Sequence, residues 1–288
     1  MSMEASLRTL LDGLIDYAGL FPPASLDMRT AVENFAAYRR GPEASWLGRF
    51  VLPAARLDEF AAVAAAAAGI EAASGAEPRE RPWRLSALIG GSLPDDLARI
   101  EAFNSAAAAQ GPGAARIDTL EMKAAGPGGI ASAMAIIPAG ITPYFEISPK
   151  EDPSPCLDVL LATGGRAKLR TGGVTPDLIP DPDEVARFLA ACARARVPFK
   201  ATAGLHHPFR SRRRLTYAPD SPEAAMHGFL NVFLAAALAA DGVPAGELAD
   251  LVREEDPAAI RFGPERAAWI WFWSSDARST SGLVATYS

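Results

Sequence analysis

Short apolar runs alternate with helix-forming segments along nearly the whole of this chain. Seven runs have the length and composition of strands: Ile15–Leu20, Trp46–Leu52, Leu85–Ile89, Ile117–Met122, Ile141–Ile147, Ala167–Leu169 and Val197–Ala201. Helical periodicity occupies other stretches: Met28–Tyr38 (with Ser25 as expected N-cap), Leu57–Ala68, Pro94–Ala109, Ile130–Ile137, Cys156–Ala162, Asp183–Ala195, Pro222–Ala240 and Ala245–Leu251. Strands that alternate with helices pair in parallel through helical crossovers. The sequence therefore predicts an α/β protein.

The number of strand–helix units favours a TIM (β/α)8 barrel. We expect residues 1–288 to form a single barrel domain with a short N-terminal helix at Leu7–Leu14, because barrels of this size commonly form one domain. The eighth strand is either Ala259–Phe262 or the aromatic run Trp269–Trp273. A doubly wound open sheet is the alternative, although no G-x-G-x-x-G follows the first strand.

Composition argues against several classes of protein. The net charge of −6 disfavours binding to nucleic acid, whose partners usually carry a basic surface. The apolar stretches are too short to cross a membrane, and no signal peptide is evident at the N-terminus. Cys156 and Cys192 lack the spacing of a metal site or of a disulfide scaffold. We therefore expect a cytoplasmic protein that acts on a small molecule, with a homo-oligomer possible.

Lysine is scarce, and its positions are informative. Of the 28 basic residues, only Lys123, Lys150, Lys168 and Lys200 are lysine. An arginine in a protein stays charged, whereas a lysine can lose its proton and become a nucleophile. Lys168 and Lys200 each lie at the end of a short apolar run that is followed by small residues. They are therefore candidates for chemistry that arginine cannot perform.

In a TIM barrel the active site lies at the carboxyl ends of the strands. Residues two apart on a strand share a face, which groups Glu121 with Lys123, Lys168 with Arg170, and Lys200 with Thr202. The other side chains expected at the strand ends, or in the loops that follow them, are Asp16, Arg49, Glu146, Thr171, Gly204, His206 and His207. If the strand registers hold, carboxylates, amines and a guanidinium converge on one site.

Lys168 and Lys200 would lie on neighbouring strands. Two ammonium groups in one partly desolvated pocket repel each other, which favours a neutral amine. A neutral lysine can attack a carbonyl and form a Schiff base, which then stabilises a neighbouring carbanion as an enamine. This pair predicts class I aldolase chemistry. The alternative is a pair of structural salt bridges, Lys168 with Glu146 and Lys200 with Glu121.

The segment from Lys168 to Gly204 resembles deoxyribose-phosphate aldolase. The K-x-x-T-G motif of that family matches Lys168-Leu169-Arg170-Thr171-Gly172, and its F-K-x-x-G-G motif matches Phe199-Lys200-Ala201-Thr202-Ala203-Gly204 in part. The resemblance implies that Lys168 forms the Schiff base and that Lys200 tunes it. The chain departs from the family at Lys123, which stands near the place of a proton-transferring aspartate. Ala203 also replaces one glycine of the phosphate-binding pair, and no clear second phosphate loop follows.

The sequence therefore predicts a carbon–carbon lyase of the aldolase type in carbohydrate metabolism, without a cofactor, acting on a small and anionic carbonyl or sugar-derived substrate. Lys168, Lys200, Glu121, Glu146 and His206 are the expected catalytic residues. Arg170 would hold an acidic group of the substrate. The remaining substrate contacts would come from Asp16, Arg49, Lys123, Thr171, Thr202, Gly204 and His207.

Two alternatives remain open. The first is a metal-dependent isomerase, epimerase or hydrolase in which His206 and His207, with Glu121 or Glu146, bind Zn or Mn. The adjacency of His206 and His207 weakens it, because neighbouring side chains diverge on an extended backbone. The second is a non-catalytic barrel that binds an anionic metabolite or a partner through the arginine-rich loop 210–214.

Overall fold

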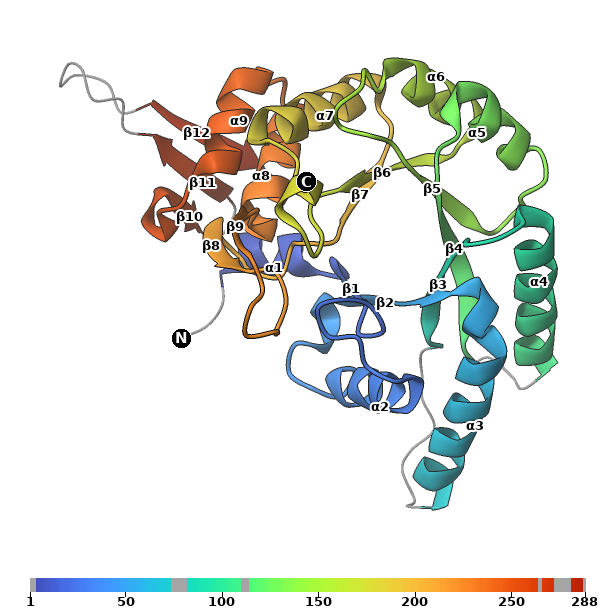
Figure 1. The fold of residues 1–288 in the computed structure, drawn as a ribbon. Helices are drawn as coiled ribbons and strands as arrows, with labels where there is room; N and C mark the ends of the chain where they lie inside the picture. The colour runs from blue at the N-terminus through green and yellow to red at the C-terminus, as the bar shows by residue number, and fades with distance from the viewer. Residues whose placement is uncertain (1–3, 74–81, 110–113, 264–265, 272–280, 287–288) are drawn as a thin grey trace. The chain divides into compact units, whose positions relative to one another are not determined.

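The computed structural model describes residues 4–73, 82–109, 114–263, 266–271 and 281–286. The chain divides into two compact units (Figure 1). The N-terminal unit comprises Asp12–Phe145, and the C-terminal unit comprises Met1–Leu11 together with Glu146–Ser288. Seven strands, β1 to β7, are hydrogen-bonded neighbours in chain order within one sheet. The predicted α/β class is therefore confirmed.

The N-terminal unit alternates strands and helices. Its strands are β1 (Ile15–Tyr17), β2 (Leu47–Pro53), β3 (Arg84–Leu88), β4 (Arg116–Lys123) and β5 (Thr142–Glu146), the last of which ends at the boundary of the unit. Its helices are α2 (Met28–Tyr38), α3 (Leu57–Ala73), α4 (Leu93–Ala109) and α5 (Gly126–Met134), with short 3-10 turns at Ala44–Trp46 and Ala54–Arg56. The strand pairs β1–β2, β2–β3 and β3–β4 are all parallel, as predicted.

Aromatic rings form the core of this unit. Phe35 of α2 packs edge-on against Phe50 of β2, with ring centroids 5.3 Å apart, and against Trp83, at 4.9 Å. Phe60 of α3 joins the same cluster, and all four side chains are buried. Because Phe50 and Leu52 face these helices, the alternation of β2 turns Arg49 and Val51 to the opposite face of the sheet.

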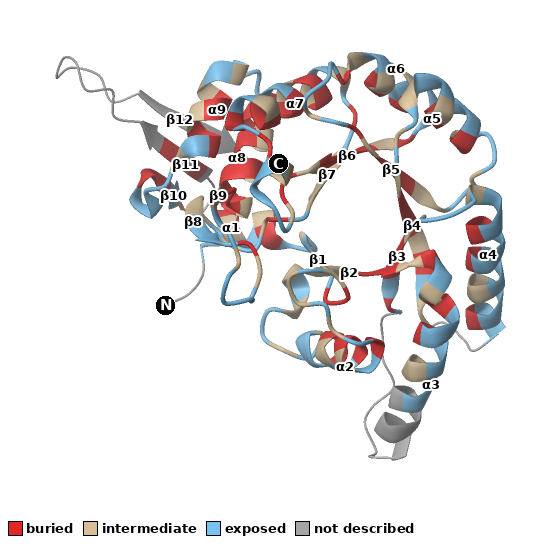
Figure 2. Cartoon of the chain, viewed as in Figure 1, coloured by how far each residue is buried: buried red, intermediate tan, exposed pale blue. Residues whose placement is uncertain are grey.

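The C-terminal unit contains the last two strands of the seven-stranded sheet and several helices. Its elements are α1 (Ala5–Leu11), α6 (Ser154–Thr163), β6 (Arg166–Arg170), α7 (Pro182–Ala195), β7 (Phe199–Thr202), α8 (Phe229–Ala240) and α9 (Ala245–Arg253), with 3-10 turns at Pro176–Leu178 and Pro257–Ala259. One side of α7 is buried and the other exposed (Figure 2). Asp181 and Glu184 close a capping box at its start, which fixes where the helix begins.

Two small antiparallel sheets complete this unit. A hairpin is formed by β8 (Ser211–Arg214) and β9 (Glu223–Met226), and β10 (Ile260–Phe262), β11 (Arg266–Trp271) and β12 (Ser281–Thr286) form a three-stranded sheet. The hairpin corrects the prediction of a helix at Pro222–Ala240, because the helix in this segment, α8, begins only at Phe229. Residues 223–226 instead pair with the arginine-rich strand, a long-range contact that the helical composition of the segment did not reveal.

The predicted eight-stranded barrel is supported only as far as seven strands. Both candidates for an eighth strand form strands, but they pair antiparallel with each other, Ile260 opposite Trp269, and not with the seven-stranded sheet. Residues 272–273 of the second candidate lie outside the described part of the chain. Within that part, no helix has both the length and the apolar composition needed to cross a bilayer.

Candidate functional site

Lys168 and Lys200 are direct cross-strand neighbours. The parallel register of β6 and β7 aligns Lys168 with Lys200, and Arg170 with Thr202. The ring of Phe199 packs against Phe188 of α7 and Phe233 of α8, with centroids 6.2 and 6.1 Å away. Since successive side chains alternate along a strand, Lys200 faces away from these helices. The two lysines thus share the inner face of the sheet in the C-terminal unit.

A carboxylate lies beside the first of these amines. Glu146 Oε2 is 3.0 Å from Lys168 Nζ, and the two side chains are only 16% and 9% exposed. Arg170 approaches the other oxygen of Glu146 at 4.0 Å and donates from Nε to the carbonyl of Gly172 at 3.0 Å. Glu146, Lys168 and Arg170 therefore form one group, which the sequence predicted from strand ends alone.

The ends of β6 and β7 are joined closely. Thr171 is buried, and its hydroxyl donates to the carbonyl of Ala203 at 2.5 Å. A Cβ atom at Gly172 would lie 2.8 Å from Cα of Gly204, and Gly204 adopts the left-handed φ of +78°. The two loops approach each other most closely at Gly172 and Gly204. Residues 171–172 and 203–204 therefore hold β6 and β7 in register.

The loop after β7 carries the two adjacent histidines. His206 is exposed and His207 is partly buried. Burial and the positive charge of Arg213 both lower the pKa of His207. Among the described residues, no three His, Cys, Asp or Glu side chains are grouped so that they could hold a metal ion. The metal-dependent alternative therefore gains no support from the described residues.

Four predicted site residues belong to the N-terminal unit. Glu121 is buried on β4 and accepts a hydrogen bond from the hydroxyl of Ser86 at 2.7 Å. Lys123 is exposed at the end of β4. Asp16 accepts the backbone N–H of Arg49 at 2.7 Å and fills the space where a Cβ of residue 48 would lie, which requires Gly48. Asp16 therefore has a structural role in joining β1 to β2.

Arg49 lies in the amino-terminal half of β2, away from the strand end where a substrate contact was expected. Its Nε donates to Asp118 at 2.6 Å, and Arg84 Nε donates to the other oxygen of Asp118, also at 2.6 Å. The sequence did not predict that Asp118 binds these arginines, because simple alternation places Asp118 on the opposite face of β4 from Glu121. An irregularity in the β3–β4 register, which steps past Asp118, changes its direction.

A second polar group in the C-terminal unit is built around His227. The side chain is fully buried, with Nε2 2.9 Å from the carbonyl of Pro180 and Nδ1 3.3 Å from Arg210 Nη1. Nε2 must donate to the carbonyl and Nδ1 must accept from the guanidinium, so the imidazole is neutral. Asn231, in the first turn of α8, accepts the backbone N–H of Arg210 at 3.0 Å. The group fixes the loop 206–210 to α8.

Stability is expected to fall in mild acid because of His227. Burial lowers its pKa from 6.5 to about 4, so the unfolded chain takes up a proton where the folded protein does not. The free energy of unfolding should therefore drop as the pH falls below 6.5, by about 2 kcal/mol between about pH 7 and about pH 5. Urea titrations across this range measure the slope. His227→Gln should flatten it, and an unchanged slope in that variant would contradict the assignment.

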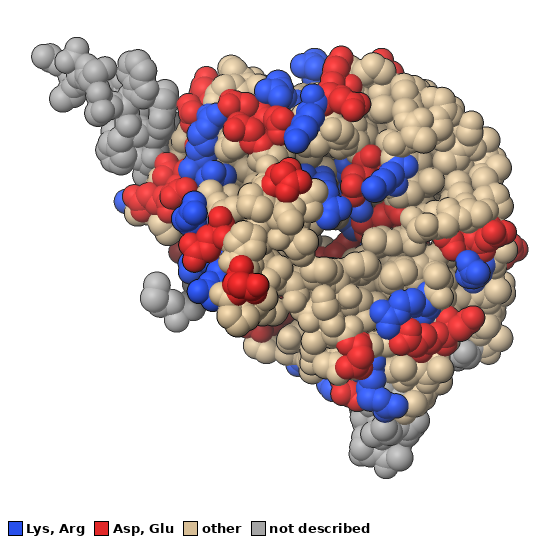
Figure 3. Space-filling model, in the orientation of Figure 1, with Lys and Arg blue, Asp and Glu red and all other residues tan. Residues whose placement is uncertain are grey.

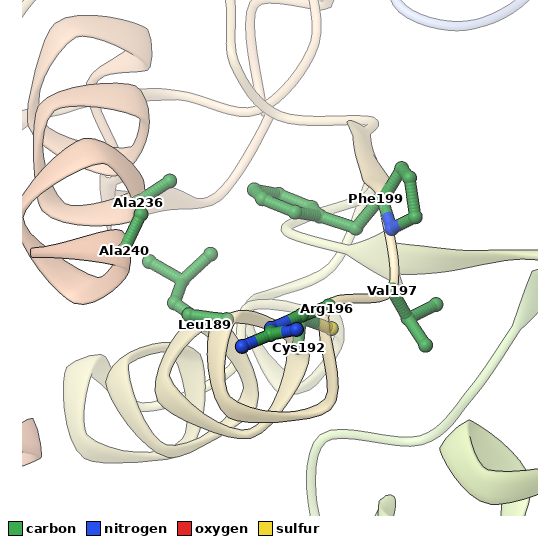
Figure 4. A pocket seen from close by; sticks show the side chains of 9 residues that line it. Leu189, Cys192, Arg196, Val197, Phe199, Ala236 and Ala240 are labelled. Atoms are coloured by element: carbon green, nitrogen blue, oxygen red, sulfur yellow. The ribbon is translucent and has the colours of Figure 1, made fainter. Parts of the chain in front are cut away.

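A separate pocket of about 430 Å³ opens between α7, α8 and the start of β7 (Figure 4). Leu189, Phe199, Ala236 and Ala240 give it an apolar lining, and Arg196 lies beside it. Val197 and Pro198 precede β7, so the pocket is at the amino-terminal end of that strand. The lysines face the other side of the sheet, so this pocket does not contain the candidate site.

The candidate site thus consists of two lysines on paired strands, one partly buried carboxylate and one arginine, at strand ends that are hydrogen-bonded to each other. No family model, no curated protein and no solved structure matches this chain.

Proposed function

We propose that this protein is a Schiff-base lyase of the aldolase type and that its seven-stranded sheet belongs to a TIM-type barrel. The observation that carries the proposal is the pairing of Lys168 with Lys200, with Glu146 3.0 Å from the first amine. A lysine that forms a Schiff base must first give up a proton. Glu146 is within hydrogen-bonding distance to accept that proton.

In the proposed reaction, Glu146 first accepts this proton and later returns it. Neutral Lys168 Nζ attacks the carbonyl carbon of the substrate, and the carbonyl oxygen becomes a hydroxyl. Protonated Glu146 then returns its proton to that hydroxyl, which leaves as water when the C=N bond forms. Glu146, now ionised again, takes the proton of the β-hydroxyl group of the substrate as the next carbon–carbon bond breaks. The distal fragment leaves as an aldehyde or ketone, and the electron pair of the broken bond passes into the iminium ion and yields an enamine, to which Glu146 can return the proton. Protonation of the enamine and hydrolysis of the resulting imine regenerate the amine.

The neighbouring residues have supporting roles in this proposal. Arg170 is 42% exposed and adjoins Glu146, so its terminal nitrogens can bind an acidic group of the substrate. Thr171 and Gly204 hold the two strand ends together, and Thr202 faces the same side as Lys200. Within the same unit, His206 remains a candidate for further proton transfer and His207 for contact with the substrate.

Borohydride reduction in the presence of a carbonyl compound is expected to trap an adduct on Lys168. Acetaldehyde, glycolaldehyde, pyruvate and dihydroxyacetone form a suitable panel. The reduced adduct blocks tryptic cleavage after residue 168, so Ala167–Arg170 survives as one peptide whose mass reports the carbonyl. The other three lysines are read in the same digest.

Two variants make this test specific. Lys168→Met should abolish the adduct, whereas Lys150→Met, at an exposed loop residue, should leave it unchanged. An adduct that maps mainly to another lysine, or none across the panel, would refute the proposal.

A purely structural ion pair is the strongest competing function for Lys168. Both partners are largely buried, and a buried charge requires a partner whether or not it reacts. In that case the protein would be a non-catalytic barrel that binds an anionic metabolite. The trapping experiment separates the two, because a structural lysine that remains paired with Glu146 would form no adduct.

A further inference from the structure

The pocket between α7, α8 and the start of β7 has the size and the lining of a small-molecule site. Its volume of about 430 Å³ lies within the range of about 300–1,000 Å³ that is usual for ligand pockets. Leu189 of α7, Ala236 and Ala240 of α8, and Phe199 of β7 line it. The ring of Phe199 stacks on Phe233 of α8 at an interplanar angle of 15°, so an aromatic contact holds this wall in place. Such a lining accepts an aliphatic chain.

One guanidinium accompanies these apolar walls. Of the described residues that line the pocket, Arg196 alone carries a charge. In Figure 4 its side chain extends along the end of α7 toward Leu189, at the edge of the pocket. On the face of the molecule in Figure 3, acidic and basic side chains are intermixed, but Arg196 is exposed and has no ion-pair partner among the described residues. The pocket therefore favours a ligand that has an aliphatic body and an anionic end.

The backbone at Arg196 would suit glycine better than arginine. Arg196 follows the last residue of α7 with a left-handed φ of +55°, and its N–H donates to the carbonyls of Ala193 and Cys192. Glycine is the usual residue at such a helix end, because any Cβ there is strained. A cation does stabilise the C-terminus of a helix, but Arg194 already supplies one in the last turn of α7. A role in binding accounts for an arginine at residue 196.

We propose that this pocket binds a small aliphatic carboxylate, with its alkyl chain between α7 and α8 and its carboxylate on Arg196. The apolar walls remove the chain from water, and the guanidinium can donate two parallel N–H bonds to the two carboxylate oxygens. The pocket lies at the amino-terminal end of β7, and the lysines lie on the opposite side of the sheet. Binding here is therefore independent of the proposed lyase reaction, and Lys168→Met should bind the carboxylate as the wild type does.

Isothermal titration calorimetry with a chain-length series tests the ligand class. Sodium butanoate, hexanoate and octanoate are titrated below the concentrations at which they form micelles. We expect saturable binding to a single site, with an affinity that rises about fourfold for each added methylene group. Octanol has an alkyl chain of similar length without the charge, and it should bind at least about tenfold more weakly than octanoate. The proposal fails if octanoate shows no saturable binding or if octanol binds equally well.

Three variants locate the binding site. Arg196→Gly should weaken octanoate binding at least about tenfold and leave octanol binding unchanged, in a protein that is no less stable because glycine adopts this conformation readily. Arg194→Gln, at an exposed residue of the same helix end, should bind both ligands normally. Ala236→Leu narrows the pocket and should weaken the binding of both. Octanoate binding that survives Arg196→Gly, or that Arg194→Gln weakens as strongly, would overturn the assignment, as would normal binding of both ligands by Ala236→Leu.

Discussion

Glu146→Gln is expected to lower the free energy of unfolding by about 3 kcal/mol, because it leaves the Lys168 ammonium buried beside a neutral amide. The same change should slow borohydride-trapped adduct formation about 100-fold, since the group that accepts the lysine proton is lost. Urea unfolding measures the first effect and the time course of trapping measures the second. Glu59→Gln is the matched control. It breaks the exposed Arg56–Glu59 pair and should cost less than about 1 kcal/mol.

The double variant Lys168→Met/Glu146→Gln separates the effect of the ion pair on stability from its effect on adduct formation. It removes both charges, so it should recover much of the stability lost in Glu146→Gln, with a coupling of about 1 kcal/mol or more. It should form no adduct, because no amine remains. If Glu146→Gln is as stable as the wild type and reacts at the same rate, Glu146 neither pairs with Lys168 in solution nor takes its proton.

Gly204→Ala is expected to destabilise the protein by about 3 kcal/mol or more, because backbone strain and a steric clash add at this residue. The added Cβ would lie 2.8 Å from Cα of Gly172 and 3.1 Å from the carbonyl oxygen of Thr171, in a backbone conformation of φ +78°. Neither neighbour is a flexible side chain, so the strands themselves would have to shift. The trapping rate at Lys168 should fall with the stability.

Two further glycines separate these causes. Gly242→Ala imposes a similar φ of +85° with no atom within 4 Å of the added Cβ, so it isolates the strain, about 1 kcal/mol. Gly172→Ala adds a Cβ 2.8 Å from Cα of Gly204, at a residue whose own φ is not left-handed, and so isolates the clash. Only the two variants at the strand ends should slow trapping. If Gly242→Ala slows it equally, the effect comes from general instability and not from the register of the lysines.

Local patterns predicted the elements of the sheet well, because alternation and apolar runs are properties of the strands themselves. The expected strand Ile117–Met122 is β4, Arg116–Lys123, and the expected helix Asp183–Ala195 is α7, which starts one residue earlier. The same patterns singled out Lys168 and Lys200, since parallel neighbours in chain order align their carboxyl ends. Features that depend on local periodicity were therefore visible in the sequence.

Long-range partners were not visible in this way. Ser25 was expected to cap the helix Met28–Tyr38, but Asp27 caps it and Ser25 has a positive φ in the preceding turn. Residues 223–226 look helical by composition, yet they pair with β8, and the candidate eighth strands pair with each other. Composition states how a segment prefers to fold alone. It does not state which distant segment supplies the hydrogen bonds that override that preference.

The two arginines that bind Asp118 contrast with the lysine that lies beside Glu146. Each guanidinium there donates an N–H to one carboxylate oxygen, and a guanidinium keeps its charge in a protein. The arginines of this network therefore stay charged. In the proposed reaction, the contact of Lys168 with Glu146 instead passes a proton from the amine to the carboxylate. An arginine at position 168 would keep a positive charge beside Glu146 but could not give up a proton, so this single substitution should preserve the ion pair and abolish the proposed Schiff base.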